Sequence, residues 1–295
     1  MEIERDRAWT MGELPQTMTE PCFRHFETDA QVGWTVASAN QLANYVSHLF
    51  LSWAENYLHE LPRSKANFDA SAAWQAKSRT AHDVAIRSEQ LNLQTMLTRV
   101  VGSFLSYVSE MLSLVFHQNP ALLLDDDRAQ YQNVQSLLSP EDRLRDIVEK
   151  RVAALSFDGL TGIQKHIEEQ LNLKLFEDSA NLEEVARVIA QRNLIIHGRA
   201  IADTKYLRRM GGYTTLKRGE SLVLEQQSVE MQARIFRLAV ADIDARASDQ
   251  FALSKLITAE QFYERVQIPF FVGDWRNTFN VDDPLLADTA DESPS

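Results

Sequence analysis

Residues Leu91 to Phe116 read LNLQTMLTRVVGSFLSYVSEMLSLVF, a densely apolar run. The apolar side chains recur at helical spacing and also fill many of the positions between. Because an α-helix turns by about 100° per residue, such a run surrounds most of the helix with apolar groups. The pattern predicts a helix that is buried on most of its circumference and ends before Pro120. A chain built around this helix is expected to be all-α.

The composition agrees with a helical globular chain. Of 295 residues, 44% are hydrophobic and 24% charged, and there are only 10 glycines and 8 prolines. One cysteine, Cys22, excludes an internal disulfide and fits a reducing compartment. The charged start MEIERDRAW does not resemble a signal peptide. Residues 30–54 carry no charge but too many amides and hydroxyls for a membrane span. We therefore expect a cytoplasmic protein without a membrane segment.

Breakers and changes in pattern divide the chain into five parts. Residues 1–28 contain Gly12, Pro15 and Pro21 and are expected to be irregular. The other parts are an N-terminal helical extension (29–85), the main helical domain (86–247), a C-terminal segment (248–280) and an acidic tail expected to be disordered (281–295).

Local signals set the expected helix ends. Ser139 and Pro140 are a good N-cap and first helical residue. Asn181 and Glu184 are spaced as a capping box, and Gly198 can end the same helix. A short β-hairpin can form over Tyr213–Leu224, around Arg218-Gly219. The helices are expected near 32–61, 70–87, 91–116, 140–155, 160–171, 181–198 and 228–246.

The helix predicted at 181–198 ends in QRNLIIHGR, residues Gln191 to Arg199. Arg192, Asn193 and His197 lie close together in this motif. Arginine offers a fixed fork of donors to phosphate oxygens, and histidine moves protons near neutral pH. These residue types suit the handling of a phosphodiester.

The stretch from Asn181 to Leu207 resembles the HEPN superfamily, the higher eukaryotes and prokaryotes nucleotide-binding domain. Domains of this family are all-helical and carry an Arg-polar-xxx-His motif near a helix end, and Arg192, Asn193 and His197 occupy its three positions. The resemblance implies a HEPN-like helical bundle over residues 86–247. It also implies a homodimer whose two motif helices share a cleft, and a metal-independent endoribonuclease that uses no cofactor. Families of this type often act as toxins or in defence against phage, with a neutralising or regulatory protein partner.

The geometry of a regular helix does not place all three motif residues on one face. Asn193 and His197 share a face, whereas Arg192 lies about 140° from His197 on a regular helix. A long arginine side chain, a loosened last turn or a second copy of the helix can bring the two groups together. In RNA cleavage by the 2′-hydroxyl, His197 would act as base or acid, Arg192 would stabilise the transition state, and Asn193 would orient the histidine or bind the phosphate.

Structural roles remain alternatives for the same residues. His197 can be a partly buried histidine that caps helix carbonyls, with Arg192 paired to Glu184 or Asp203. Glu110 is the only acid between Val100 and Phe116, so it either holds Arg192 or lies on the one exposed edge of its helix.

A basic segment follows the motif in a chain of net charge −12. The overall charge argues against non-specific nucleic-acid binding by the whole surface, but not against a local site. The segment is either a solvated loop or an RNA-facing surface, on which Tyr206 and Tyr213 can stack on unpaired bases. The residues expected to bind RNA are Arg199, Lys205, Tyr206, Arg208, Arg209, Lys217 and Arg218.

Two functions fit the sequence. The first is a metal-independent endoribonuclease with a toxin or phage-defence role. The second is a non-catalytic dimerising module that binds nucleotide, RNA or a protein partner. The acidic surface and the N-terminal third, for which the resemblance gives no role, favour the second.

Overall fold

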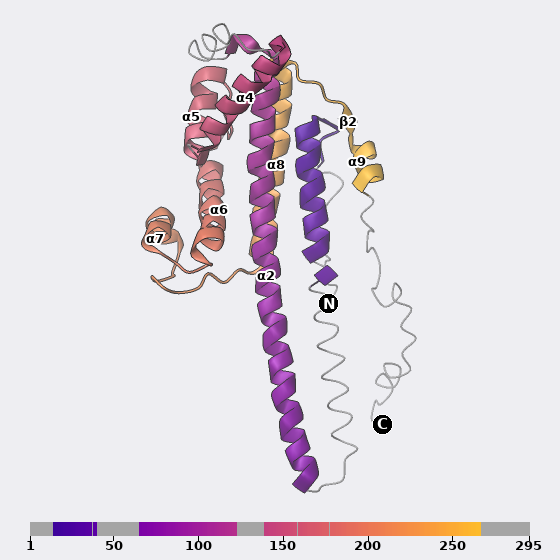
Figure 1. Ribbon diagram of the computed structural model, residues 1–295, viewed down its shortest axis with the longest axis vertical. Coiled ribbons are helices and arrows are strands. Elements are labelled where there is room, and N and C mark those ends of the chain that lie inside the picture. The colour runs from indigo at the N-terminus through magenta and orange to yellow at the C-terminus, as the bar shows by residue number, and fades with distance from the viewer. Residues whose placement is uncertain are drawn as a thin grey trace, which may run out of the picture.

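The computed structural model describes residues 14–36, 38–39, 65–122, 139–157, 159–176 and 178–266 (Figure 1). This part of the chain is mostly helical, which confirms the all-α prediction. A helix over residues 20–36, called the N-terminal helix below, lies between β1 and α2 in the chain. The remaining elements are β1 (Thr17–Met18), α2 (Lys65–Gln118), η2 (Pro120–Leu122), α4 (Pro140–Phe157), α5 (Gly159–Leu171), α6 (Ser179–Gly198), α7 (Thr204–Met210), η3 (Gly211–Tyr213), α8 (Gln226–Phe251), β2 (Ile257–Thr258) and α9 (Ala259–Val266).

The long helix α2 forms the centre of the bundle. It packs against α8, α4 and α6, and its N-terminal end extends past the other labelled elements (Figure 1). The expected break between helices at 70–87 and 91–116 is wrong, because Ser88, Glu89 and Gln90 contain no helix breaker and the helix continues through them. The apolar run is buried as predicted, in Leu93, Leu97, Val100, Val101, Phe104, Val108, Met111, Leu112, Val115 and Phe116.

Helix α2 also contains a segment of membrane-spanning length. Its part Ile86–Gln118 is long and apolar enough to cross a membrane, with a mean hydropathy of 1.3 in its most apolar window. Half of that window is buried inside the described structure.

The N-terminal helix begins earlier than the sequence indicated. Residues 20–28 are helical, so the expectation of irregular structure up to residue 28 is wrong for them. Pro21 lies in the first turn, where a helix tolerates proline, and Thr19 Oγ1 accepts a hydrogen bond from the Cys22 N–H at 3.4 Å. Just before this helix, β1 pairs with β2 in an antiparallel arrangement, Thr17 with Thr258 and Met18 with Ile257.

Buried polar groups connect the N-terminal helix to the bundle. Asp29 and Arg237 of α8 form an ion pair with an Nη1–Oδ2 distance of 2.9 Å. The Thr19 N–H donates to Asp244 Oδ2 at 3.1 Å. His25 Nδ1 lies 3.0 Å from the hydroxyl of Ser103 on α2. The N-terminal helix therefore shares one core with α2 and α8.

Several expected boundaries fall inside helices. The divisions predicted after residues 28, 85 and 247 lie within the N-terminal helix, α2 and α8 respectively. The start of α4 is confirmed, since the Asp142 N–H donates to Ser139 Oγ at 3.1 Å. The α5 prediction is also confirmed, and α8 is longer than expected at both ends. Of the helix expected at 32–61, residues 32–36 and 38–39 are helical, and the rest lies outside the described residues. The acidic tail 281–295 also lies outside them.

We expect the Asp29→Ala substitution to destabilise the fold strongly. It leaves Arg237, whose side chain is 8% exposed, without the Asp29 carboxylate, and removing one partner of a buried ion pair costs about 3–5 kcal/mol. The control is Glu110→Gln, which removes the ion pair between Glu110 and Arg24, whose side chains are 38% and 55% exposed. That change should cost about 0–1 kcal/mol. Urea unfolding measures both, and equal losses would contradict the role given to Asp29.

A second expectation concerns pH. Burial lowers the pKa of His25 from 6.5 to about 3. Between these values the unfolded chain binds a proton at His25 and the folded chain does not, so the free energy of unfolding should fall as the pH drops through this window. His25→Asn should reduce this dependence. Urea unfolding at several pH values between 4 and 7 compares the two slopes, and identical slopes would show that His25 is not their source.

Candidate functional site

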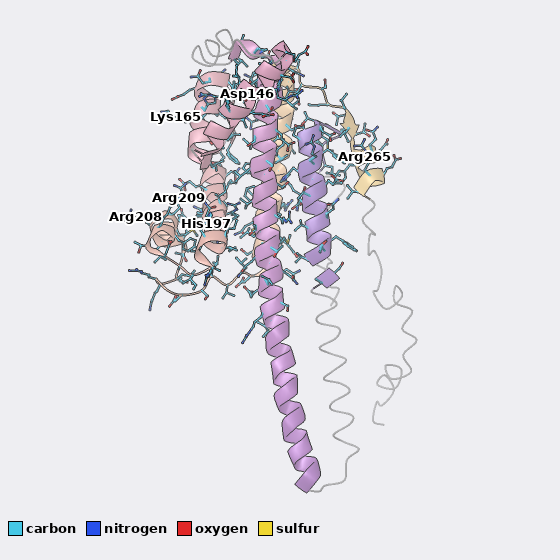
Figure 2. All side chains as sticks on the ribbon, in the orientation of Figure 1. Asp146, Lys165, His197, Arg208, Arg209 and Arg265 are labelled. Carbon is cyan, nitrogen blue, oxygen red and sulfur yellow. The ribbon has the colours of Figure 1, made fainter. Side chains whose placement is uncertain are left out.

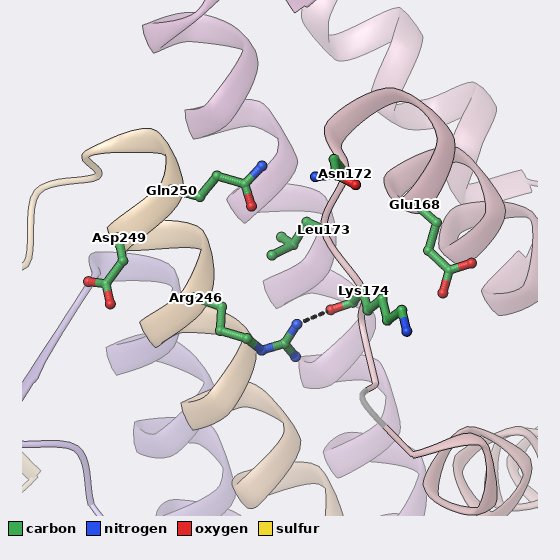
Figure 3. Close-up of a pocket in the computed structure, with 7 residues that line it drawn as sticks. All are labelled: Glu168, Asn172, Leu173, Lys174, Arg246, Asp249 and Gln250. Carbon is green, nitrogen blue, oxygen red and sulfur yellow. Dashed lines mark hydrogen bonds between the residues drawn. The ribbon is translucent and has the colours of Figure 1, made fainter.

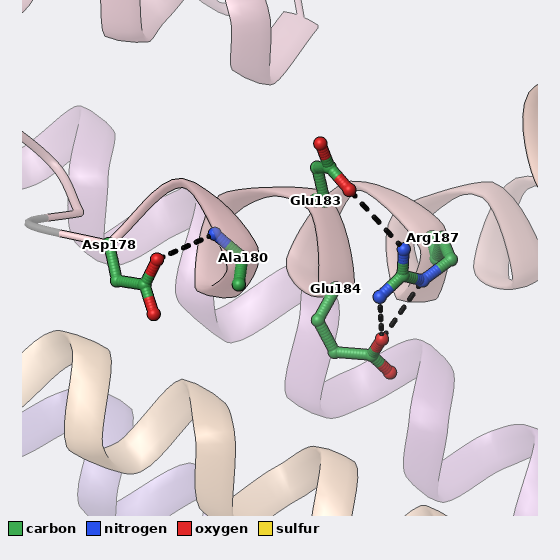
Figure 4. A network of polar contacts seen from close by, with 5 residues as sticks. All are labelled: Asp178, Ala180, Glu183, Glu184 and Arg187. Carbon is green, nitrogen blue, oxygen red and sulfur yellow. Dashed lines mark hydrogen bonds and ion pairs between the residues drawn. The ribbon is translucent and has the colours of Figure 1, made fainter.

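Helix α6 carries the motif, and its start differs from the prediction. The N-cap is Asp178, whose carboxylate accepts a hydrogen bond from the Ala180 N–H at 2.9 Å. The capping box expected from Asn181 and Glu184 is wrong. Glu184 instead accepts from the Arg187 side chain, with an Nε–Oε2 distance of 2.9 Å (Figure 4). This hydrogen bond to Glu184 raises the pKa of Arg187.

The burial pattern of α6 divides its residues between core and solvent. Val185, Val188 and Leu194 are buried, and α6 packs against α2 and α8. Asn193 and His197 are exposed, one turn apart on the same face. The packing of α6 thus presents two of the three motif residues to solvent.

Arg192 is the third motif residue and is half-buried. Its Nη1 donates to Asn193 Oδ1 at 2.9 Å, so the guanidinium turns toward the face of Asn193 and His197. Its Nε is buried and has no hydrogen-bond partner among the described residues. The structure therefore joins Arg192 to Asn193, while His197 makes no side-chain hydrogen bond or ion pair within the described part of the chain.

The end of α6 has an unusual backbone. Gly198 is the last helical residue, and the C-cap is Arg199, with φ 53° and ψ 37° in the left-handed region. Ala200 follows with φ 59°, so two residues other than glycine take this conformation in succession. The expected C-cap role of Gly198 is wrong. The glycine instead makes room for Leu194, since a Cβ there would lie 2.8 Å from Leu194 Cδ1.

The purely structural roles considered for Arg192 and His197 do not fit the contacts of the described residues. Glu184 pairs with Arg187, and Asp203 caps α7 by accepting from the Tyr206 N–H at 2.7 Å. His197 is exposed, so it is not a partly buried cap. The supporting role predicted for Glu110 is wrong as well, because Glu110 faces the N-terminal helix and pairs with Arg24 at 3.1 Å.

The basic segment begins at the end of α6 and continues through α7. Figure 2 shows Arg208 and Arg209 of α7 beside the end of α6 that carries His197. Helix α7 packs against α6, and the cations of this segment are all exposed. They are Arg199, Lys205, Arg208, Arg209, Lys217 and Arg218.

The β-hairpin expected over Tyr213–Leu224 is wrong. Residues 219–222 pair with residues 200–202 instead, through Ala202 N–H to Glu220 O at 2.8 Å and Leu222 N–H to Ala200 O at 2.7 Å. One isolated bridge, Ile201 with Ser221, results. Residues 200–202, which follow the left-handed end of α6, thus take up the backbone hydrogen bonds that a hairpin over Tyr213–Leu224 would need.

Two tyrosines of the segment differ in exposure. Tyr206 is only 5% exposed, so the prediction that it contacts RNA by stacking is wrong. Burial raises the pKa of Tyr206, and the nearby side chains of Thr214 and Gln191 partly offset this rise. Tyr213 is 69% exposed, and the Arg187 guanidinium carbon lies 4.0 Å from the centre of its ring.

Among the hollows of the described residues, two lie at places that the sequence did not indicate. One, of about 650 Å³, lies between α8 and the segment that follows α5, where the Arg246 guanidinium donates to the backbone oxygen of Lys174 (Figure 3). No predicted site residue lines it. The other, of about 420 Å³, is lined by Gln191, Tyr206, Tyr213 and residues around them. No sequence period signals either hollow, because each forms between elements whose relative placement is set by tertiary packing.

The fold and the site define a mostly helical protein that exposes an amide and a histidine at one helix end, with an arginine bonded to the amide. Comparison with protein-family models, with curated proteins and with solved structures gives no match for this chain.

We expect Arg199→Gly to stabilise the fold. Glycine takes the left-handed conformation at a helix C-cap without the steric cost of a Cβ, which is worth about 1 kcal/mol. Arg199→Ala is the control, because alanine keeps the Cβ and should change little. Urea unfolding of the two variants tests this, and an equal effect of both would show that the conformation at Arg199 carries no strain.

Proposed function

We propose that this chain is a metal-independent endoribonuclease of HEPN type, with Arg192, Asn193 and His197 at its active site. The observation that supports this most is the hydrogen bond from Arg192 Nη1 to Asn193 Oδ1. It directs the guanidinium toward the exposed face that also carries His197, which reduces the separation expected from a regular helix.

The proposed reaction uses Arg192 and His197 on this face, and water takes the second proton-transfer role. The 2′-oxygen forms a bond to the adjacent phosphorus as the bond from phosphorus to the 5′-oxygen breaks. A base takes the 2′ proton, and an acid gives a proton to the leaving 5′-oxygen. His197 acts as one of these catalysts, worth roughly 10²–10⁴-fold. Arg192 stabilises the charge on the phosphate oxygens, and the products are a 2′,3′-cyclic phosphate and a 5′-hydroxyl.

The charges around the site suit RNA. Six exposed cations lie between Arg199 and Arg218, and Asp203 is the only acid in that stretch. The Asp203 carboxylate is used to cap α7. Although the chain carries a net charge of −12, this local surface is therefore positive enough to attract a polyanion.

A two-fold homodimer completes the proposal. Leu182, Ile189 and Ile196 recur every seven residues on α6, and Asn193 lies on the same side. Ile196 is 42% exposed, and the other two are partly buried. Pairing of two α6 helices along this stripe would cover Ile196 and bring His197 of one copy near Arg192 of the other.

The proposed role in the cell is that of a toxin or phage-defence effector, restrained by a neutralising protein. An alternative is a non-catalytic dimerising module that binds nucleotide, RNA or a protein. The lack of an orienting partner for the His197 imidazole among the described residues favours this alternative, because general bases are usually held by a third group. Incubation of the purified chain with labelled RNA in EDTA separates the two.

If two copies share one cleft, two variants that are inactive alone should complement each other in a mixed dimer. Light scattering should give twice the chain mass, and Ile196→Glu should give the single mass and lose RNA cleavage. The Arg192→Ala and His197→Ala chains, each inactive alone, should regain part of the activity when mixed, because the mixed dimer holds one intact arginine and one intact histidine in its cleft. A monomer that cleaves RNA would contradict the shared cleft.

If Arg192 and His197 are catalytic, replacing either residue should reduce RNA cleavage without unfolding the chain. His197→Ala and Arg192→Ala should each reduce RNA cleavage by at least roughly 10²-fold with little change in thermal stability, since neither side chain is part of the apolar core. Arg192→Lys should fail too, because a point charge does not replace the guanidinium fork. Glu110→Gln is the matched control and should cleave at the wild-type rate. Wild-type cleavage by folded His197→Ala would refute the assignment.

A further inference from the structure

A groove next to the motif has no role in the reaction described above. It is lined by α6, α7, η3 and the segments 214–216 and 221–223, and it measures about 420 Å³. This volume lies in the lower part of the range of about 300–1,000 Å³ for small-molecule sites. Gln191 lines the groove and directly precedes Arg192 in α6. The groove and the motif thus occupy neighbouring faces of one helical turn.

An aromatic ring is held at the edge of this groove. Arg187 lies over the ring of Tyr213 at 4.0 Å and is fixed in turn by Glu184. Tyr213 is nevertheless 69% exposed, so the face opposite Arg187 is open to solvent. A ring that is held on one face and open on the other is the arrangement that single-strand binding proteins use to stack a base.

The wall of the groove carries oriented polar groups. Gln191 Oε1 accepts a hydrogen bond from Gln232 Nε2 at 3.1 Å, so the Gln191 amide nitrogen points to the other side. The hydroxyl of Tyr206 and the side chain of Thr214 line the groove together with Gln191. Amide, phenol and threonine groups together offer both donors and acceptors, which the edge of a nucleobase requires.

The charges at the groove favour a nucleotide over an uncharged ligand. Lys205, Arg208 and Arg209 are exposed on α7, whose Tyr206 and Met210 line the groove. The nearby carboxylate of Glu220 is engaged by the Lys217 N–H at 2.8 Å. Cations on the rim and an aromatic ring at the edge are what an unpaired base with its phosphate would need.

We propose that this groove binds one unpaired base of single-stranded RNA, stacked on Tyr213, with its phosphate on the cations of α7. This inference rests on the proposed function, because the bound base would flank the phosphate held at Arg192 and His197. It defines the substrate class as RNA whose bases are unpaired next to the cleavage site.

The test measures binding to the full chain carrying His197→Ala, so that the RNA stays intact. The probe is a fluorescein-labelled oligouridine of about ten nucleotides, a length typical of single-strand sites. Adding Tyr213→Ala should weaken binding at least about fivefold, the lower end of the loss for one base stack, without changing the salt dependence. Tyr213→Phe should bind normally because it keeps the ring. Leu256→Ala removes another exposed apolar side chain, 76% exposed, and should have no effect.

Further measurements distinguish base stacking on Tyr213 from binding of the RNA backbone by the cations of α7. Arg208→Gln with Arg209→Gln should weaken binding and flatten its salt dependence, since fewer counterions are released. Tyr213→Ala should not affect binding of duplex RNA, whose bases are already stacked. Unchanged oligouridine affinity in folded Tyr213→Ala, or equal losses on single and double strands, would overturn the base site. Loss of binding in Tyr213→Ala together with full cleavage by His197→Ala would support the groove and refute the proposed active site.

Discussion

Burial of the apolar surface of α2 is the constraint on which the rest of the structure depends. Between Leu93 and Phe116 this surface surrounds most of the helix, so it has to be covered from several directions at once. Helices α8, α4 and α6 each cover part of it. For α6, the residues that meet this demand are Val185, Val188 and Leu194. The rotation of α6 about its axis is thereby fixed, and with it the exposure of Asn193 and His197.

A second constraint acts on the N-terminal helix. Its Asp29 and His25 are buried together with Arg237 of α8, and a buried charge is tolerated only where its partner is correctly placed. Apolar contacts alone would permit the helix to rotate or slide. The ion pair and the His25–Ser103 contact select one position among these. The same groups link the stability of this helix to pH, since burial keeps His25 neutral.

Local signals in the sequence predicted much of this fold. The apolar run of α2 and the Ser139–Pro140 start of α4 depend on neighbours within a few residues, and both are confirmed. Asp178 was missed because Asn181 with Glu184 is an equally good helix start by spacing alone. The burial of Tyr206 and the pairing of Glu110 with Arg24 depend on contacts between distant elements, which residue types and spacing do not encode. For the site, the sequence indicated the motif and its cations. It could not indicate that Arg192 bends toward Asn193, nor the groove beside it.

The proposed function requires that Arg192, Asn193 and His197 form one site that directs a 2′-hydroxyl at its own phosphate. Mass spectrometry of the ends produced from one RNA tests it most directly, with the wild-type and His197→Ala chains purified in parallel and assayed in EDTA. The account predicts 2′,3′-cyclic phosphate and 5′-hydroxyl ends from the wild type, no such ends from His197→Ala, and no cleavage where the RNA carries a 2′-deoxy residue. Fragments with 3′-hydroxyl ends, or the same cyclic ends from His197→Ala, would contradict it.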